Sequence, residues 1–96
     1  MYTAVQARNI ANEKYNHNYY RHYRWYCGTI MKGITKGAKR GDLRYDFTAS
    51  DNRRLNRDVL AQIAQELSQL GYNATVGTDV SQDGKHKYAM ISITWA

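Results

Sequence analysis

The sequence predicts an α+β domain of element order αβαββ. In this fold a long N-terminal helix and a second helix pack on one face of a three-stranded sheet, which includes a C-terminal β-hairpin. Apolar residues recur every three or four positions across residues 4–36 and again across residues 55–70, which is typical of one face of a helix. Apolar and polar residues alternate after each of these segments, as they do in strands with one buried face. The fold class therefore follows from three changes of hydrophobic period along the chain.

Residues 4–36 are predicted to form a single helix. Thr3 and Gln6 have the spacing of a capping box, in which each side chain satisfies a backbone N–H of the other residue. Gly37 follows two lysines and is predicted to end the helix, and the sequence contains no proline that would interrupt it. The positions at helical spacing are Ala4, Ala7, Ala11, Tyr15, Tyr19, Tyr23, Tyr26, Ile30 and Ile34.

A strand and a second helix follow. Alternation across residues 43–47, with Leu43, Tyr45 and Phe47 on one side, predicts the strand. The second helix is expected to end at Gly71, where Tyr72 folds back toward the last turn in a Schellman motif. The start of this helix is open, because four residues are suitable N-caps: Ser50, Asp51, Asn52 and Asn56. Its apolar face consists of Leu55, Val59, Ile63, Leu67 and Leu70.

The last part of the chain is predicted to be a β-hairpin. The Asp83-Gly84 pair is a turn signal between two segments with strand-like alternation. One strand is expected to present Tyr72, Ala74, Val76 and Val80 on one face. The other is expected to present Ala89, Ile91, Ile93 and Trp95.

The length suits one domain, which spans residues 1–96. No apolar run approaches the roughly 20 residues that a membrane span requires, and the N-terminus lacks the pattern of a secretory signal. The single cysteine, Cys27, has no partner for an internal disulfide. These features predict a protein that is cytoplasmic or assembled from the cytoplasm and makes no contact with a membrane.

Positive charge is concentrated in the first helix. The formal net charge is +6, and seven basic residues but no acidic one lie from Lys14 to Arg40. Such a field attracts phosphates, nucleic acid or an acidic protein surface, although a helix face that is merely solvated would have the same composition. The candidate residues for binding an anion or nucleic acid are Arg21, Arg24, Lys32, Lys36, Lys39 and Arg40.

Tyrosines occupy the opposite side of the same helix. A place in the core is the simplest interpretation, but each buried hydroxyl needs a partner, and tyrosine is favoured at protein interfaces. Aromatic residues beside Arg and Lys also suit stacking on nucleotide bases. A helix of this length is about 50 Å long, so its N-terminal part should overhang the domain and leave Tyr15 and Tyr19 in water unless a second chain covers them. The predicted interface residues are Tyr15, Tyr19, Tyr23 and Tyr26.

No residue pattern indicates catalysis, a bound metal or a cofactor. His17, His22 and Cys27 are each five positions apart, whereas metal ligands on one helix prefer spacings of three or four. Gly28 and Gly33 have the spacing of a phosphate-binding loop, but the Lys-Ser/Thr pair that must follow is absent. Cys27 is predicted to be a buried, unreactive thiol. We therefore expect a protein that binds without catalysing a reaction.

Several motifs carry a resemblance to known proteins. The C-terminal half contains Leu-Gly-Tyr-Asn-Ala-Thr-Val at residues 70–76, a Gln-Asp-Gly turn, and Ile-Ser-Ile-Thr-Trp at residues 91–95. With Ala7-Arg8 in the first helix and the spacing of Ile30, Ile34 and Gly37, these motifs resemble a group of small, largely uncharacterised proteins of tailed bacteriophages. The chain departs from that group by an Ile-Thr insertion before its last tryptophan and by its basic, Tyr-rich first helix. The shared motifs describe a fold, so the resemblance implies a phage origin and no particular activity.

Three functions are compatible with these observations. The first is a virion structural or assembly component that forms a homo-oligomer or binds other phage proteins, with its basic face toward nucleic acid or an acidic surface. The second is a host-directed inhibitor of a defence, which binds a nucleotide signal or a nucleic-acid enzyme. The third is a nucleic-acid-binding module, and it is less favoured because no helix-turn-helix, zinc-finger or KH pattern is present. The expected location is the virion or the host cytoplasm.

Overall fold

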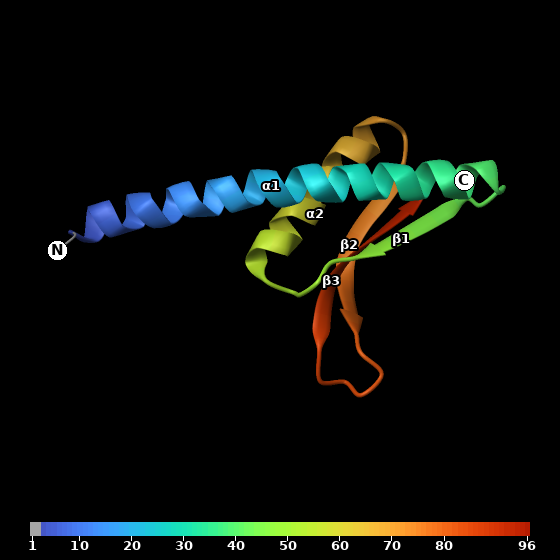
Figure 1. The fold of residues 1–96 in the computed structure, drawn as a ribbon. Helices are drawn as coiled ribbons and strands as arrows, with labels where there is room; N and C mark the ends of the chain where they lie inside the picture. The colour runs from blue at the N-terminus through green and yellow to red at the C-terminus, as the bar shows by residue number, and fades with distance from the viewer. Residues whose placement is uncertain (1–2) are drawn as a thin grey trace.

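The computed structural model describes residues 3–96 and has the predicted element order (Figure 1). The elements are α1 (Ala4–Lys39), β1 (Arg44–Thr48), α2 (Arg54–Gln69), β2 (Asn73–Val80) and β3 (Lys87–Thr94). The strands form one antiparallel sheet in the order β1-β3-β2, so the last strand of the chain lies in the centre. The prediction of an α+β fold, with two helices packed on a three-stranded sheet and a C-terminal β-hairpin, is confirmed.

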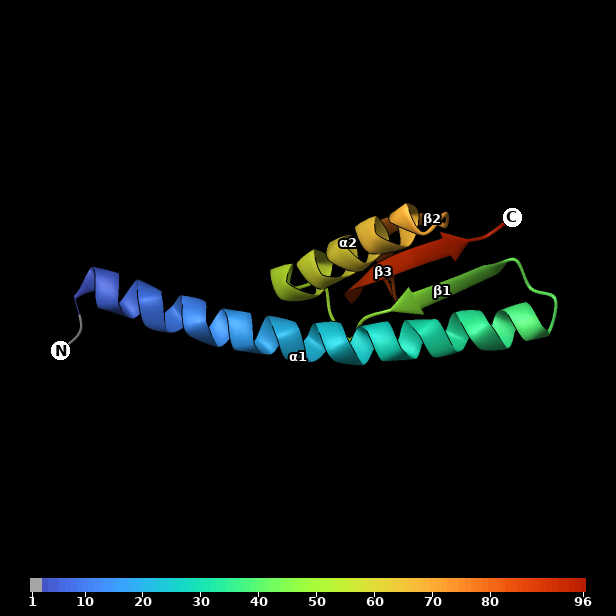
Figure 2. The same ribbon diagram turned by 90° about the horizontal axis from the view of Figure 1, so that it is seen from above.

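The core lies between the two helices and one face of the sheet. α1 packs along β1, and α2 packs along β2 and β3 (Figure 2). β3 supplies the middle of this face, where Ile91 pairs with Phe47 and Ile93 pairs with Tyr45. The buried apolar residues are Tyr26, Ile30 and Ile34 of α1; Val59, Leu60, Ile63, Ala64 and Leu67 of α2; and Ala49, Ala89, Ile91 and Ile93 of the sheet and its connections.

α1 begins as the sequence predicts but ends later. The capping box is present, because the backbone N–H of Gln6 donates to the Thr3 hydroxyl and the Gln6 amide oxygen accepts from the backbone N–H of Thr3. The predicted end at Lys36 is wrong: the helix continues to Lys39. Gly41, with φ +88°, is the residue that adopts the left-handed conformation of a Schellman motif.

One of the glycines inside α1, Gly33, is needed for close packing. A Cβ at position 33 would collide with the ring of Tyr45, which crosses α1 at this point. Gly37 is buried, and a Cβ there would contact the Trp95 ring at 3.6 Å. This distance is an ordinary van der Waals contact, so Gly37 is buried beside Trp95 without a glycine being required there.

α2 differs from the prediction at its start and agrees with it at its end. Its N-cap is Arg53, which makes no side-chain capping bond, so none of the four proposed caps is used. The Asp51 carboxylate instead accepts from the backbone N–H of Arg53 at 2.8 Å. At the C-terminus the backbone N–H of Tyr72 donates to the Leu67 carbonyl at 3.1 Å, and Gly71 has φ +98°. The predicted Schellman motif is confirmed.

The β-hairpin extends beyond the helices (Figure 1). The Asp-Gly turn is confirmed, with Gly84 at φ +73° and the Asp83 carboxylate accepting from the backbone N–H of Lys85. The predicted buried face of β2 is only partly correct, because Val76 and Val80 are 37% and 50% exposed. These valines have the right alternation, but α2 does not reach far enough along the hairpin to cover them.

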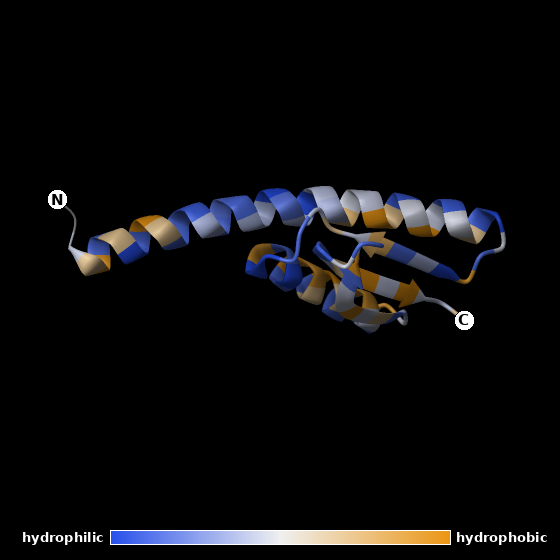
Figure 3. Cartoon of the chain, turned by 90° about the horizontal axis from the view of Figure 1, so that it is seen from below, coloured by the Kyte–Doolittle hydropathy of each residue, from blue (hydrophilic) through white to orange (hydrophobic). Residues whose placement is uncertain are grey.

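The N-terminal part of α1 projects from the domain. The molecule measures 58 × 35 × 17 Å, and its radius of gyration is 15.9 Å, whereas a compact chain of this size would have about 13 Å. Residues 3–14 are exposed, and Figure 3 shows apolar residues on the first turns of α1 although no other element lies beside them. We call residues 4–14 the N-terminal overhang.

Candidate functional site

The inner side of α1 is bound to α2 by a row of tyrosines. Tyr15, Tyr19 and Tyr23 are one helical turn apart, and their hydroxyls donate to side chains of α2 that are also one turn apart. We call these three pairs the tyrosine ladder; they are Tyr15–Asp58, Tyr19–Gln62 and Tyr23–Glu66. The two helices therefore run in the same direction, and the N-terminal end of α2 lies beside Tyr15.

The tyrosine ladder corrects one expectation from the sequence. Tyr15 and Tyr19 were expected to lie in water without a second chain, but both are half-buried against α2 of their own chain. The overhang is shorter than predicted because α2 reaches back to cover this turn of α1. The signal that predicts the contact was in the sequence: residues 58, 62 and 66 repeat the four-residue spacing of the tyrosines.

Tyr26 makes a further, buried contact between α1 and α2. Its hydroxyl donates to the Asn56 amide oxygen at 2.8 Å, and the Asn56 amide nitrogen donates to Asp51 at 2.7 Å. Tyr26 and Asn56 are each 3% exposed, so their hydrogen bond satisfies two polar groups that would otherwise be buried without a partner. Burial raises the pKa of Tyr26, and the phenol stays protonated and acts as a donor.

Hydrogen bonds to carboxylates raise the pKa of two tyrosines of the tyrosine ladder. The hydrogen bond to Asp58 raises the pKa of Tyr15, and the hydrogen bond to Glu66 raises the pKa of Tyr23. Burial raises the pKa of the Cys27 thiol, which lies beside Tyr23. A protonated thiol is a weak nucleophile, so the surroundings of Cys27 do not activate it for a reaction.

The candidate anion-binding residues lie on the opposite side of α1. Their side chains are exposed, and Arg40 forms an ion pair with Asp42 at 3.0 Å. Among the described residues, the other five have no acidic partner within ion-pair distance. We call these five the outer face of α1; they are Arg21, Arg24, Lys32, Lys36 and Lys39.

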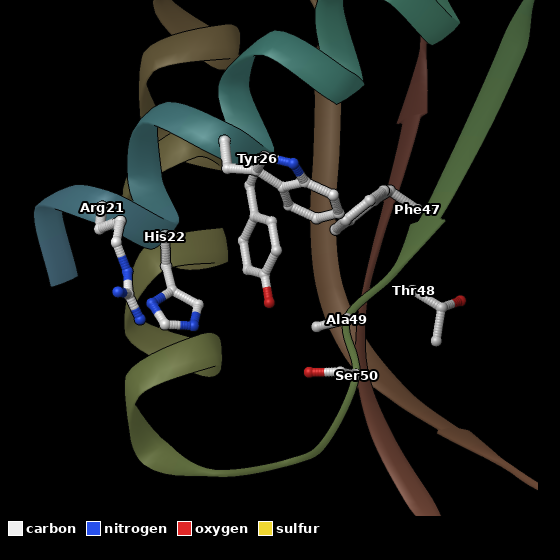
Figure 4. Close-up of a pocket in the computed structure, with 8 residues that line it drawn as sticks. Arg21, His22, Tyr26, Phe47, Thr48, Ala49 and Ser50 are labelled. Atoms are coloured by element: carbon white, nitrogen blue, oxygen red, sulfur yellow. The ribbon is translucent and has the colours of Figure 1, made fainter. Parts of the chain in front are cut away.

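Two hollows flank Trp25 on this side of the molecule. The first, of about 530 Å³, lies between α1 and the end of β1 (Figure 4). We call it the aromatic hollow, and its lining residues are Arg21, His22, Trp25, Tyr26, Phe47, Thr48, Ala49 and Ser50. The second, of about 670 Å³, is the basic hollow, which is lined by His17, Tyr20, Arg21, Arg24 and Trp25. Arg21 and Trp25 belong to both and separate one from the other.

Three aromatic rings form the wall of the aromatic hollow. The ring centroids of Tyr26 lie 5.3 Å from Trp25 and 5.1 Å from Phe47. Trp25 is 63% exposed, so much of its indole is free to contact a ligand. In Figure 4, Arg21 and His22 lie on one side of Tyr26, and the hydroxyl of Ser50 points into the same space.

His22 adds a polar group with a defined orientation. Its Nδ1 lies 2.7 Å from the carbonyl oxygen of Asn18, and a carbonyl only accepts, so Nδ1 carries the proton. Nε2 is therefore the acceptor of the neutral ring. Sequence reasoning missed Phe47 and Ser50 as site residues, because α1 and the end of β1 meet only in the folded chain. It considered His22 as a metal ligand but not as part of this hollow.

The structure brings together some of the predicted site residues. Arg21 and Arg24 meet at the basic hollow, whereas Lys32, Lys36 and Lys39 continue along the helix outside both hollows. Within residues 3–96, no group of three or more His, Cys, Asp or Glu side chains is placed to hold a metal ion. The same part of the chain has no helix that is both long and apolar enough to cross a bilayer.

Comparisons with protein-family models, curated proteins and solved structures found no significant match to this chain.

Proposed function

We propose that this chain is a non-catalytic bacteriophage protein that takes part in virion structure or assembly and contacts nucleic acid through the outer face of α1. The observation that carries the proposal is a row of exposed cations with no acidic partner within residues 3–96. From Arg21 to Lys39 this row extends about 27 Å along the helix. Phosphates of one duplex strand are spaced 3.4 Å or so along the duplex axis, so the five cations of this row are spread over a length that spans several phosphates.

The proposal predicts binding that depends on salt and on this face. Fluorescence anisotropy should detect binding to DNA at about 20 mM salt and its loss by about 200 mM, because phosphate contacts release counterions. Replacing Arg21 and Arg24 with Glu should weaken binding about tenfold or more and lower the salt slope by about one for each lost contact. Thermal melting should be unchanged, since both side chains are exposed.

A matched control distinguishes an effect of this face from an effect of the net charge of the protein. Lys85→Glu with Lys87→Glu makes the same change of charge in the hairpin, which projects away from α1 (Figure 1). This variant should keep most of the affinity. Equal weakening by the two variants, or no binding of the unmodified protein even at about 20 mM salt, would refute a nucleic-acid role for the outer face of α1.

The assembly part of the proposal is supported by the N-terminal overhang. Val5 and Ile10 are 61% and 46% exposed there, and a helix of this length with no neighbour is marginal in water. We place the contact with a second copy at the overhang, because the hydroxyls of the tyrosine ladder are already bound to α2. Light scattering should give a mass above the 11.1 kDa of one chain.

The overhang contact has its own test. Val5→Ser with Ile10→Ser should yield a monomer, while Val80→Ser in the hairpin, which removes a comparably exposed valine, should not change the mass. A monomeric unmodified protein at micromolar concentration would rule out the homo-oligomer. Nucleic-acid binding by the outer face of α1 would stand independently of that result.

A second candidate function is a host-directed inhibitor that binds a nucleotide signal. The aromatic hollow favours it, because its volume lies within the range of roughly 300–1,000 Å³ that small-ligand sites occupy. Calorimetric titration with linear and cyclic nucleotides distinguishes the two functions. Saturable binding of one nucleotide that persists at about 200 mM salt, together with no affinity for DNA or RNA, would favour the inhibitor.

A further inference from the structure

We propose that the aromatic hollow holds one unpaired nucleobase while the phosphate of the same nucleotide lies on Arg21 and Arg24. This inference rests on the proposed function and specifies its ligand: a strand with unpaired bases, or a free nucleotide, in preference to a duplex. The two hollows have different chemistry and share Arg21 and Trp25. A nucleotide has the same two parts, a flat apolar ring and an anion, joined by a short sugar.

The aromatic residues provide a surface for stacking. The Trp25 and Phe47 centroids are 6.4 Å apart, with their planes at 64°, so the two rings do not stack face to face on one another. Phe47 and Tyr26 are packed against the core, whereas Trp25 is mostly exposed. The free face of Trp25 is therefore the platform on which a base would lie.

Polar groups at the hollow suit the edge of a base. The Tyr26 hydroxyl donates to Asn56, and His22 and Ser50 are among the other polar residues that line the aromatic hollow (Figure 4). Nε2 of His22 accepts when the ring is neutral, and the Ser50 hydroxyl both donates and accepts. Donors and acceptors on a base edge are free only when the base is unpaired.

The basic hollow lies where the phosphate would be. Arg21 belongs to both hollows, and Arg24 and His17 line the basic one. Neither arginine has an acidic partner among the described residues, so both guanidinium groups are available for the anion. Bases inside a duplex are stacked and paired and cannot enter the aromatic hollow without being extruded.

Trp25 fluorescence tests the inference directly. A Trp95→Phe background leaves Trp25 as the single tryptophan, since the chain has two. A single-stranded oligothymidine should quench this emission to saturation, whereas the corresponding duplex should bind with little quenching. A panel of mononucleotides and their cyclic forms, titrated in the same way, distinguishes a free nucleotide from a strand as the source of the base.

Anisotropy of Trp25→Ala completes the test. The substitution should weaken binding of the single strand about tenfold or more and leave duplex binding unchanged. Trp25→Phe should retain most of the affinity because it keeps a stacking ring. Thermal melting should be unchanged in both variants, since the indole is exposed.

The outcomes separate the inference from the proposed function. Equal binding of single and double strands, with no effect of Trp25→Ala, overturns the base site and leaves nucleic-acid binding by the outer face of α1 intact. Quenching by a free nucleotide without any affinity for DNA or RNA supports the base site and overturns nucleic-acid binding. No binding of strand, duplex or nucleotide at about 20 mM salt overturns both.

Discussion

Two sets of aromatic residues on the same helix have opposite surroundings. On the inner side of α1, the hydroxyls of Tyr15, Tyr19, Tyr23 and Tyr26 all donate to side chains of α2. On the outer side, Tyr20 and Trp25 are 64% and 63% exposed and lie among basic residues. The same residue types therefore stabilise the fold on one side and are available for binding on the other.

The difference between the two sides comes from where the polar partners lie. Tyrosine buries a ring and needs a partner for its hydroxyl, and α2 offers an acceptor at each successive turn of the inner side. Among the described residues the outer side has no comparable row of acceptors. Trp25 lies beside Tyr26 and Phe47, and Tyr20 lies beside Tyr19, but both rings remain mostly exposed. Substitutions on the inner side should change stability, and substitutions on the outer side should change binding.

The largest predicted effect is at Tyr26. Tyr26→Ala removes a buried ring and leaves Asn56 without its donor, so we expect a loss of about 3–5 kcal/mol of unfolding free energy. Tyr20→Ala, at an exposed position on the outer side of the same helix, should change stability by no more than about 0.5 kcal/mol. Urea denaturation measures both. Comparable losses would mean that the outer side of α1 is also packed in solution.

Two glycines of α1 extend the comparison to the backbone. Gly28→Ala has no atom within 4 Å of the added Cβ, so the better helix propensity of alanine should stabilise the protein by about 0.5–1 kcal/mol. In Gly33→Ala the added Cβ would collide with the ring of Tyr45, so this substitution should destabilise the protein by about 1–3 kcal/mol. Thermal melting should therefore shift in opposite directions for the same substitution. Stabilisation by both would show that Tyr45 does not cross α1 at this position.

The fold was predictable because it follows from local periodicity. A period of three to four residues defined both helices, alternation defined the strands, and Asp83-Gly84 defined the hairpin turn. The end of α1 was missed because Gly37 and Gly41 are both credible stops, and only the folded backbone shows that Gly41 is the one with a positive φ. The central position of β3 also depends on long-range pairing, which no local pattern specifies.

The candidate site was predictable only in part. The basic stripe is a property of one helix, so Arg21 and Arg24 could be found from spacing alone. The aromatic hollow combines α1 with residues after β1, and its walls exist only once Phe47 packs against Tyr26. The tyrosines were located correctly on one stripe of α1, but Tyr15 and Tyr19 were expected to need a second chain, because only the apolar face of the second helix was considered.

The effect most specific to the inner side is a dependence of stability on alkaline pH. Hydrogen bonds to Asp58 and Glu66 raise the pKa of Tyr15 and Tyr23, and burial raises that of Tyr19, above the value of 10.0 for an unperturbed tyrosine. Above about pH 10 the unfolded chain therefore loses phenolic protons that the folded chain keeps. Stability from this source is complete below about pH 10 and falls as the pH rises further, because the native state binds more protons than the unfolded state.

Replacing the three tyrosines of the ladder with Phe isolates this contribution. At about pH 8 the triple variant should be less stable by roughly 0.5–1.5 kcal/mol for each lost hydrogen bond, and nearer the lower figure because the pairs are only half-buried. Between about pH 10 and pH 11.5 its urea midpoint should fall less than that of the unmodified protein, because phenylalanine has no proton to release. Lysines and arginines are identical in the two proteins, so their titration cancels in the difference.

Tyr20→Phe is the control, since its exposed ring has no partner on α2 to lose. Parallel declines of the triple variant and the unmodified protein would mean that the hydroxyls of Tyr15, Tyr19 and Tyr23 are not held by α2, and that the inner side of α1 is as open to water as the outer one.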